Sequence, residues 1–306
     1  MFGAAIVALS LACGRVADSA PTAGESTKPI TLNVADWTGS RITSTIVAKL
    51  LRKIGNDVTL VPLDGGAIFP ALEDGDLQAA PEVWSSAQST AIAAALATGK
   101  VMNLGNTGLI GMDRWWYPDY VKAQCPGLPD WHALNNCAKL FATLQTGSKG
   151  QLLLYPASWG GHDDERVKSL GLNFQIVRTG SEAALLAQVK AAYLRHQPIL
   201  AWLYEPHWAP ARFHGEYVQL PKYTDACYSS GKFDCEKPSG PIVKLENVDL
   251  AAKFPHATKL MQQFTMTNAD YDAMVGEVDV DGKSVDAVAD EWIAQHQDQW
   301  SRWIAL

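Results

Sequence analysis

The chain has 306 residues, of which 47% are apolar and 19% charged, the balance of a globular protein with enough material for two cores. Its net charge of −7 comes from 25 basic and 32 acidic residues, with no lysine or arginine block that could follow a phosphate backbone. We therefore expect no nucleic-acid partner.

The N-terminus has the composition of an export signal. Residues 1–12 are apolar with one exception, and a polar stretch rich in Gly, Ser, Pro and Thr follows up to Pro29. We interpret residues 1–28 as a signal peptide and linker, with a frayed helix as the alternative, and expect a periplasmic protein. Cys13 ends the apolar run as Ser-Leu-Ala-Cys, which resembles a lipoprotein cleavage site, so a lipid anchor there is a second hypothesis.

Strand and helix patterns alternate after residue 29. Period-two alternation predicts strands, and apolar spacing near 3.6 residues predicts helices. The order is a strand at 30–34, a helix at 42–54, a strand at 58–62, a helix from 68 to near 75, a strand at 77–84, a helix at 87–98 and a short strand at 109–112. A β-α-β-α series implies a parallel sheet with helices on its faces.

An aromatic run, Trp115-Trp116-Tyr117-Pro118, marks the expected crossover to a second lobe. A similar series follows, with strands at 151–155, 174–177 and 198–202 and helices at 163–170 and 181–195. A last helix, at 285–304, carries an apolar stripe and is expected to pack on the first lobe. We expect residues 29–118 and 208–306 to form lobe 1, and residues 119–207 to form lobe 2.

Four cysteines fall in two close pairs, Cys125 with Cys137 and Cys227 with Cys235. In an oxidising compartment such pairs are typical of local disulfides. Zinc is the alternative, but neither pair has the two-residue spacing or the nearby histidine pair of a structural zinc site.

Aromatic side chains gather in or just after the predicted strands, at Trp37, Trp84, Trp159, Trp202 and Tyr204. Ligands of open α/β sheets bind at the carboxyl ends of the strands, so these rings are expected to face one cleft. A trimethylammonium group has no hydrogen to donate, and proteins hold it through apolar contact and the faces of aromatic rings, of which tryptophan is the best. Core filling is the alternative for each ring taken singly.

Four local motifs resemble the substrate-binding proteins of glycine betaine, proline betaine and choline ABC transporters: Asp36-Trp37-Thr38, Glu82-Val83-Trp84, Trp159-Gly160-Gly161 and Leu203-Tyr204-Glu205-Pro206-His207-Trp208. The resemblance covers most of the chain after residue 29. It implies a two-lobed α/β fold of the type II periplasmic binding proteins, with a mixed sheet in each lobe and the ligand cleft between the lobes. It also implies an ABC permease as the partner and closure about a hinge around the ligand.

The same resemblance implies which rings form the cage. Trp84 from one lobe and Trp159 from the other would be facing walls, with Trp37 as a third. This chain has Tyr204 where relatives carry tryptophan before the Glu-Pro-His step, and Trp202 lies two residues earlier on the same face of the strand. The fourth wall is therefore open between Tyr204 and Trp202.

Fewer residues are candidates for binding the other end of the ligand. The amides of Gly160 and Gly161 at a helix start could hold a betaine carboxylate, with an ordinary glycine turn as the alternative. Trp116 and Asp113 lie at the expected crossover and could reach the cleft, where Asp113 would complement a cation, although a solvated loop carboxylate is the simpler interpretation.

Two polar clusters resemble metal sites without matching one. The first is interpreted as helix-capping residues: His162, Asp163 and Asp164. The second misses the EF-hand spacing, and a β-turn explains it: Asp279, Asp281 and Asp286 with Gly282. We expect neither a metal nor a cofactor.

No motif predicts an enzyme, since the chain lacks a nucleophile elbow, a zinc-binding histidine pair, a phosphate loop and a dinucleotide fingerprint. The sequence thus predicts a monomeric solute-binding protein for a quaternary amine such as glycine betaine or choline. The alternative ligands are trimethylamine N-oxide, carnitine, or a sugar stacked on tryptophan, although sugar sites need more convergent polar side chains.

Overall fold

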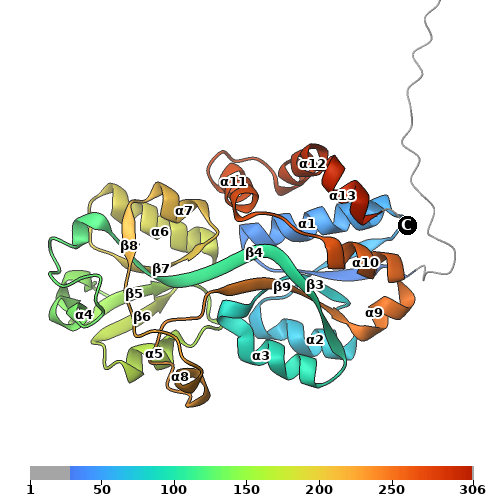
Figure 1. The fold of residues 1–306 in the computed structure, drawn as a ribbon. Coiled ribbons are helices and arrows are strands. Elements are labelled where there is room, and N and C mark those ends of the chain that lie inside the picture. Colours follow the sequence, from blue (N-terminus) through green and yellow to red (C-terminus); the bar gives the residue numbers. More distant parts are fainter. Residues whose placement is uncertain (1–27, 305–306) are drawn as a thin grey trace, which may run out of the picture.

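The computed structural model describes residues 28–304, so the predicted signal segment before Lys28 and the anchor hypothesis at Cys13 lie outside the described residues. Figure 1 shows two lobes, each with strands flanked by helices, joined by the long strand β4. The predicted two-lobed α/β architecture is confirmed. Within the described part of the chain, no helix has both the length and the apolar character needed to cross a membrane.

The chain enters lobe 1 first. Its elements there are β1 (Ile30–Val34), α1 (Thr38–Lys53), β2 (Val58–Pro62), α2 (Ile68–Asp74), β3 (Ala79–Trp84) and α3 (Ser85–Ala97), followed by β4 (Val101–Pro118). The elements that follow are α4 (Ala133–Asn136), β5 (Gly150–Leu154), α5 (Asp163–Ser169), β6 (Phe174–Arg178), α6 (Glu182–Leu194), β7 (Leu200–Glu205), α7 (Trp208–Arg212), β8 (Gly215–Tyr217) and α8 (Asp225–Ser229). The last are β9 (Gly240–Asn247), α9 (Val248–Lys253), α10 (Pro255–Gln263), α11 (Asn268–Asp279), α12 (Val285–Gln295) and α13 (Gln297–Trp303).

Local signals set several of these boundaries close to their predicted positions. α2 ends at Gly75, whose φ of 79° lies in the left-handed region that glycine adopts without strain. α6 begins after Ser181, whose side chain accepts a hydrogen bond from the Ala184 amide. α1 begins at Thr38, four residues before its predicted start, and this brings its N-terminus close to Trp37.

The strands form one continuous order, β2-β1-β3-β9-β4-β7-β5-β6, with β8 beside β4. β1 is parallel to β2 and β3, while β9 runs antiparallel between β3 and β4. β5 is parallel to β6 and β7, and β7 is antiparallel to β4. Both lobes are therefore mixed sheets, and the carboxyl ends of their parallel strands meet the cleft.

The crossing between lobes differs from the predicted one. β4 pairs with β9 up to Gly111 and with β7 from Met112 onward, so one strand passes between the lobes well before Pro118. β8 pairs with the end of β4, and Arg166 Nε donates to Cys235 O at 2.7 Å. These contacts put residues 215–239 with lobe 2, so the predicted boundary at residue 208 is too early. Such a boundary depends on long-range strand pairing, which leaves no local pattern.

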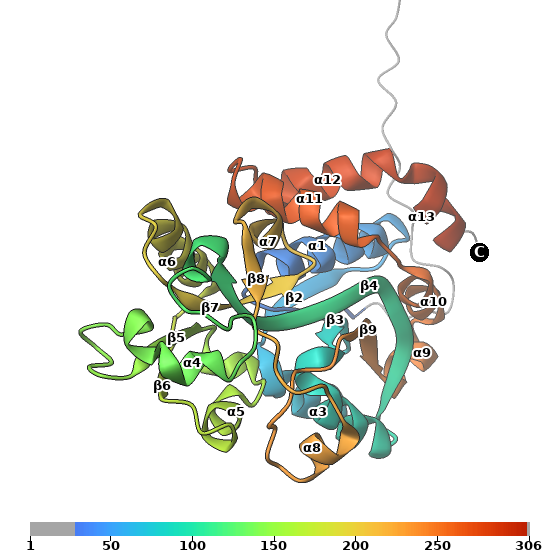
Figure 2. The same cartoon turned by 60° about the vertical axis from the view of Figure 1, so that its left-hand side comes forward.

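Helices α1 and α10–α13 cover one face of the lobe 1 sheet, and α2 and α3 cover the other (Figure 1). α11 and α12 lie against α1 in both views (Figure 2). The predicted single helix at 285–304 is wrong, because the backbone leaves the helical region at His296. The break turns α13 back, and Trp303 packs edge-on against Phe264 at 5.7 Å between ring centroids.

Both cysteine pairs are joined as disulfides, Cys125 to Cys137 and Cys227 to Cys235. Both bridges lie on the lobe 2 side of the molecule, the first before β5 and the second in the segment that leads into β9. Each closes a loop that carries little regular structure, which limits the conformations open to that loop in the unfolded chain.

Glu246, on β9, is fully buried in lobe 1. Burial raises the pKa of Glu246 to about 7, and the hydrogen bond that Thr258 Oγ1 donates to it offsets only part of this shift. Between about pH 4.5 and pH 7 the folded protein therefore holds a proton that the unfolded chain has released.

We expect Glu246→Gln to remove this pH dependence of stability. The unfolding free energy of the wild type should fall as the pH rises from 4.5 to 7, because release of the proton favours the unfolded chain. The amide still offers an oxygen to Thr258, so the variant should be more stable by roughly 2–3 kcal/mol near pH 8 and nearly equal near pH 4.5. Urea unfolding at both pH values measures this, and a pH-independent difference would contradict it.

Candidate functional site

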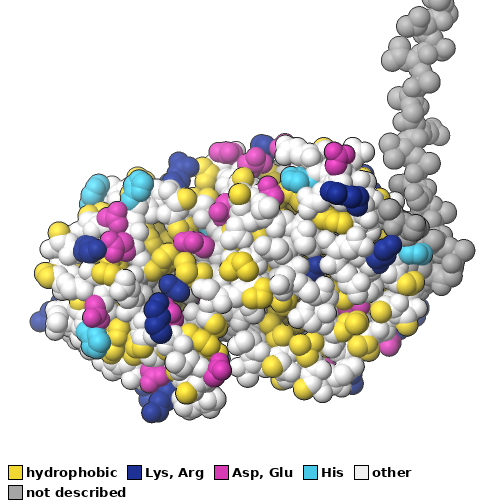
Figure 3. All heavy atoms as spheres, in the orientation of Figure 1, with side chains coloured by type: hydrophobic (Ala, Val, Ile, Leu, Met, Phe, Trp, Pro, Cys, Tyr) yellow, Lys and Arg dark blue, Asp and Glu magenta, His cyan; other side chains and the backbone are white. Residues whose placement is uncertain are grey.

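A cavity of about 40 Å³ lies between the lobes. At roughly 10–15 Å³ for each water molecule, it has room for about three waters or one very small solute. Its wall consists of four tryptophans, two tyrosines, one carboxylate and the first turn of α3: Trp37, Trp84, Trp159, Trp202, Tyr155, Tyr204, Asp113, Ser86, Ala87 and Gln88. Figure 3 shows the notch between the lobes at the lower edge of the molecule, with the charged side chains of this face scattered.

Rings from the two lobes touch in pairs across the cavity. Trp37 and Trp159 meet edge-on with ring centroids 5.1 Å apart, and Trp84 meets Tyr204 at 5.2 Å. Both candidates for the fourth wall line the cavity, since Trp202 lies 5.0 Å from Tyr204 and 5.9 Å from Trp159. These contacts join the lobes, so the structure is a closed form.

Tyr155 is a wall that the sequence interpretation missed. It stacks on Trp159 with an interplanar angle of 11° and directly follows β5. Its position just after a strand is the signal that selected the other rings, and it could have been found by the same rule.

A buried carboxylate orients two of the tryptophans. Oε1 of Glu82 accepts hydrogen bonds from Trp37 Nε1 at 2.7 Å, Trp84 Nε1 at 3.0 Å and Tyr271 Oη at 2.9 Å. Glu82 is 2% exposed, so its charge is poorly screened. Hydrogen bonds from indole N–H groups to a carboxylate polarise the rings, which makes their faces better partners for a cation.

A second buried carboxylate, that of Asp113, orients a tryptophan in the lobe 2 wall. Trp202 Nε1 donates to its Oδ2 at 3.0 Å, and Lys237 Nζ lies 2.7 Å from the same oxygen. The other oxygen, Oδ1, is buried and has no hydrogen-bond partner among the described residues. Asp113 is only 3% exposed, so the interpretation as a solvated loop carboxylate is wrong: β4 carries it into the lobe interface.

Behind this wall, Asp163 organises a second buried network. It accepts hydrogen bonds from Trp115 Nε1 at 2.9 Å and from Tyr155 Oη. Burial opposes ionisation of Asp163, but the charges of Lys237 and Arg166 outweigh burial and lower its pKa to about 2. The helix-capping role predicted for Asp163 is therefore wrong, because its carboxylate supports the cage from behind. In the same predicted cluster, His162 occupies the N-cap position without a side-chain cap, and Asp164 pairs with Arg178.

Three predicted site residues are absent from the cavity wall. Trp116 is 1% exposed and belongs to the core of lobe 2. The amide of Gly160 donates to Ala157 O within its own turn at 3.3 Å. Gly161 has a φ of 102°, and a Cβ there would lie 2.0 Å from Tyr155 Oη, so packing against the buried network requires a glycine.

The start of α3 supplies polar groups that the sequence interpretation did not select. Ser86 Oγ and Gln88 Oε1 are buried without a hydrogen-bond partner in residues 28–304. Gln88 has non-helical φ and ψ of −128° and 18°, which interrupts the first turn. No acidic residue occupies this turn, and Ser86, Ala87 and Gln88 line the cavity. The first N–H groups of a helix lack partners within the helix, so this turn and the Ser86 hydroxyl are candidate donors to a ligand.

The predicted acidic cluster near Gly282 does not converge on one point. Asp279 Oδ1 accepts from Thr38 Oγ1 at 2.7 Å, whereas Asp286 pairs with Lys49 at 2.8 Å. Gly282 has a φ of 75°, the left-handed conformation of a glycine turn.

Comparison with known proteins places this chain in a family. Residues 28–295 match the family model of the substrate binding domain of the ABC-type glycine betaine transport system. The chain is 30% identical over 291 residues to the trimethylamine N-oxide-binding protein of Pelagibacter ubique, with 91% of each protein covered.

Solved structures share the fold at low identity. An ABC-transporter choline-binding protein in complex with choline matches with a TM-score of 0.75 and 17% identity, over 90% of this chain and 91% of that one. Lactococcal OpuAC in its closed, liganded conformation with glycine betaine matches with a TM-score of 0.71 and 18% identity, over 90% of this chain and 99% of that one. The predicted resemblance is confirmed: the chain belongs to the family of substrate-binding domains of ABC-type glycine betaine transport systems, which are solute-binding proteins of transporters.

Proposed function

We propose that this protein is the periplasmic binding component of an ABC importer and that its ligand is a small trimethylammonium compound, with trimethylamine N-oxide as the first candidate. The observation that carries the proposal is the cage of six aromatic rings from both lobes. The carboxylates of Glu82 and Asp113 hydrogen-bond three of its indoles.

The cage suits the cationic half of such a ligand. Methyl groups on nitrogen carry the positive charge and offer no hydrogen to donate, so ring faces and nearby buried carboxylates provide the attraction. Each ring face contributes about 0.5–2 kcal/mol when water is excluded. Several together support a binding free energy of about −8 kcal/mol, which corresponds to a micromolar dissociation constant.

The size and polarity of the cavity favour an N-oxide at the other end. No lysine, arginine or histidine is among the described residues of the wall, so a full carboxylate would lack a cationic partner. The Ser86 hydroxyl and the free amides of the first turn of α3 can donate to one small oxygen. The trimethylamine N-oxide-binding relative at 30% identity supports the same choice.

Choline is the second candidate, because one observation favours it. Asp113 lines the cavity, and its Oδ1 has no hydrogen-bond partner among the described residues. This oxygen could accept a hydrogen bond from the choline hydroxyl, a donor that the N-oxide does not have.

The mechanism we propose is hinged closure. Ligand enters between open lobes, the rings of both lobes close around it, and β4 and β9, which lie side by side between the lobes, bend at the hinge. The closed monomer then docks on its permease in the inner membrane. Export through the N-terminal signal, with or without a lipid on Cys13, would place it there.

Intrinsic tryptophan fluorescence tests this function. We expect micromolar binding of trimethylamine N-oxide, and binding of glycine betaine weaker by roughly tenfold or more, because its carboxylate has no cation to meet. Carnitine should be excluded by size, and maltose and glutamate serve as controls. A response to maltose alone would contradict the proposed class of ligand. If glycine betaine bound most tightly, trimethylamine N-oxide would be the wrong ligand, but the assignment of the cage to a methylated nitrogen would still hold.

A further inference from the structure

Beside the cage, a carboxylate of lobe 2 caps a helix of lobe 1. Glu182 is the first residue of α6, and its Oε2 accepts a hydrogen bond from the Thr38 amide at 2.8 Å. Thr38 is the first residue of α1, and the two residues are 144 positions apart in the sequence. The contact exists only where the two lobes meet.

Helix α1 has no cap of its own. Its N-cap residue, Trp37, makes no side-chain cap, and its first turn contains no acidic residue. The first amides of a helix lack partners within the helix, and the helix dipole favours a negative charge beside them. Glu182 supplies both the acceptor and the charge in the closed form, and opening of the lobes would leave this end of α1 to water.

The same carboxylate reaches the cage. Oε1 of Glu182 accepts a hydrogen bond from the hydroxyl of Tyr204, the cage wall that meets Trp84. Thr38 in turn directly follows Trp37, the wall that meets Trp159. Glu182 thus joins a cage ring of lobe 2 to the residue that follows a cage ring of lobe 1, and it is not part of the cavity wall.

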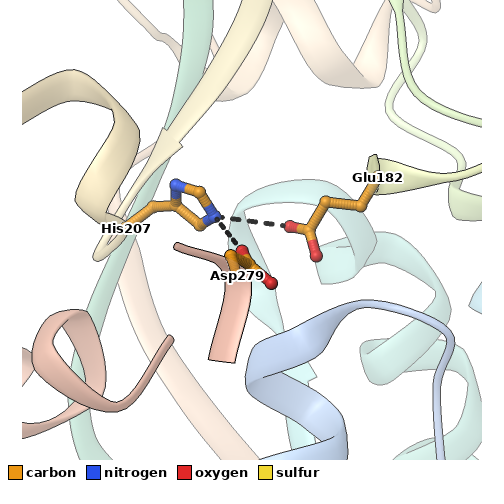
Figure 4. Close-up of side chains that lie close together, drawn as sticks. All are labelled: Glu182, His207 and Asp279. Atoms are coloured by element: carbon orange, nitrogen blue, oxygen red, sulfur yellow. Dashed lines mark ion pairs between the residues drawn. The ribbon is translucent and has the colours of Figure 1, made fainter. Parts of the chain in front are cut away.

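His207 and Asp279 extend this contact (Figure 4). His207 Nε2 lies 3.7 Å from Glu182 Oε1 and 3.6 Å from Asp279 Oδ2. Asp279, at the end of α11 in lobe 1, also accepts from Thr38 Oγ1 at 2.7 Å and from Trp208 Nε1 at 2.9 Å. Trp208 begins α7, which packs on α11, so these contacts also join the lobes.

The tautomer of His207 argues against a metal site at this cluster. Its Nδ1 accepts a hydrogen bond from the Ala209 amide at 3.0 Å, so Nδ1 carries no proton and the proton lies on Nε2. A histidine that binds a metal through Nε2 needs its lone pair there and donates its Nδ1 proton to a second group. This arrangement is the reverse. Nε2 faces the carboxylates of Glu182 and Asp279 at 3.7 and 3.6 Å, too far for a hydrogen bond but close enough for an electrostatic attraction between the N–H group and both carboxylates.

We propose that Glu182, His207 and Asp279 form an interlobe latch, a set of positioning residues that holds the lobes closed over the ligand without touching it. The inference rests on the proposed solute-binding function, which it deepens. Its consequence is kinetic: the latch forms after the ligand has entered, so it governs release and leaves entry unchanged.

Stopped-flow fluorescence with trimethylamine N-oxide tests the latch. In Glu182→Ala, we expect the dissociation rate constant to rise by roughly tenfold, with the association rate constant within about twofold of wild type. Glu182→Gln keeps an acceptor for Thr38 and should recover most of the wild-type rate. Asp279→Asn should act in the same direction as Glu182→Ala, and the double variant should fall short of the product of the single effects.

A matched control is Asp249→Asn, which removes a first-turn carboxylate from α9, away from the lobe interface. It should leave both rate constants unchanged. Unchanged dissociation in Glu182→Ala and Asp279→Asn would overturn the latch, as would equal changes in both rate constants together with a lower melting temperature, which indicate damage to the fold.

Small-angle X-ray scattering separates a failed latch from a failed ligand assignment. Without ligand, Glu182→Ala should be more extended than the wild type, and with ligand it should close less completely. If no methylated amine changes the fluorescence, the proposed function fails, and scattering of the ligand-free proteins still compares their closed fractions. Identical scattering of wild type and variant would then overturn the latch as well.

Discussion

Replacing Trp159 by alanine should weaken binding of trimethylamine N-oxide by more than about tenfold, because the variant loses a ring face and opens the cage to water. Trp159 contacts rings of both lobes, with Trp37 on one side and Tyr155 and Trp202 on the other. Its removal therefore also loosens three neighbouring walls. Isothermal titration calorimetry on the purified protein measures the loss.

Trp300→Ala is the control for this experiment. Trp300 lies on α13, where its Nε1 donates to Ile293 O at 2.7 Å, and it is not part of the cavity wall. The Trp300→Ala variant should bind the ligand as tightly as the wild type does. Equal losses in both variants would mean that tryptophan removal damages the fold, and the cage interpretation would then fail.

The second large effect is expected at Gly65, where the lobes meet backbone to backbone. A Cβ on Gly65 would lie 1.6 Å from the carbonyl oxygen of Ser158, the residue before Trp159, and its φ of 51° is unfavourable for alanine. Gly65→Ala should therefore block full closure and weaken binding by roughly 10–100-fold, the equivalent of an overpacking cost of about 1–3 kcal/mol. Calorimetry and small-angle scattering with ligand would record weak binding and an open shape.

The neighbouring glycine offers a close control. A Cβ on Gly66 would meet nothing within 4 Å, and its backbone is outside the left-handed region. Gly66→Ala should bind and close normally. If Gly65→Ala closed normally, the backbone at Ser158 would have to move to make room for the added Cβ. The close approach of Gly65 to Ser158 would then not control binding.

The cage combines two physical effects that are usually treated separately. Ring faces provide local attraction for methylated nitrogen, and Glu82 adds buried negative charge close behind Trp37 and Trp84, whereas Lys237 balances the charge of Asp113. The hydrogen bonds also fix the planes of three indoles, so little side-chain freedom remains to be lost on binding. The rings are thus largely held in place for the proposed ligand before it arrives.

The sequence by itself determined the local parts of this protein. Strand and helix periodicity located most elements of both lobes, and the rule that aromatic residues follow strands selected Trp37, Trp84, Trp159 and Trp202, which all line the cavity. This works because the carboxyl ends of parallel strands lie at one edge of a sheet, so a position along the strand also gives a position in space.

Only the tertiary structure decided the contacts between distant segments. The path of β4 through both lobes, the three donors on Glu82, the buried network around Asp163 and the cap that Glu182 provides for α1 each join residues far apart in the chain. A carboxylate in a sequence carries no sign of whether it will meet water or an indole. Its role depends on which surfaces the fold brings together, because burial and partners, rather than residue type, set the energy of a charge.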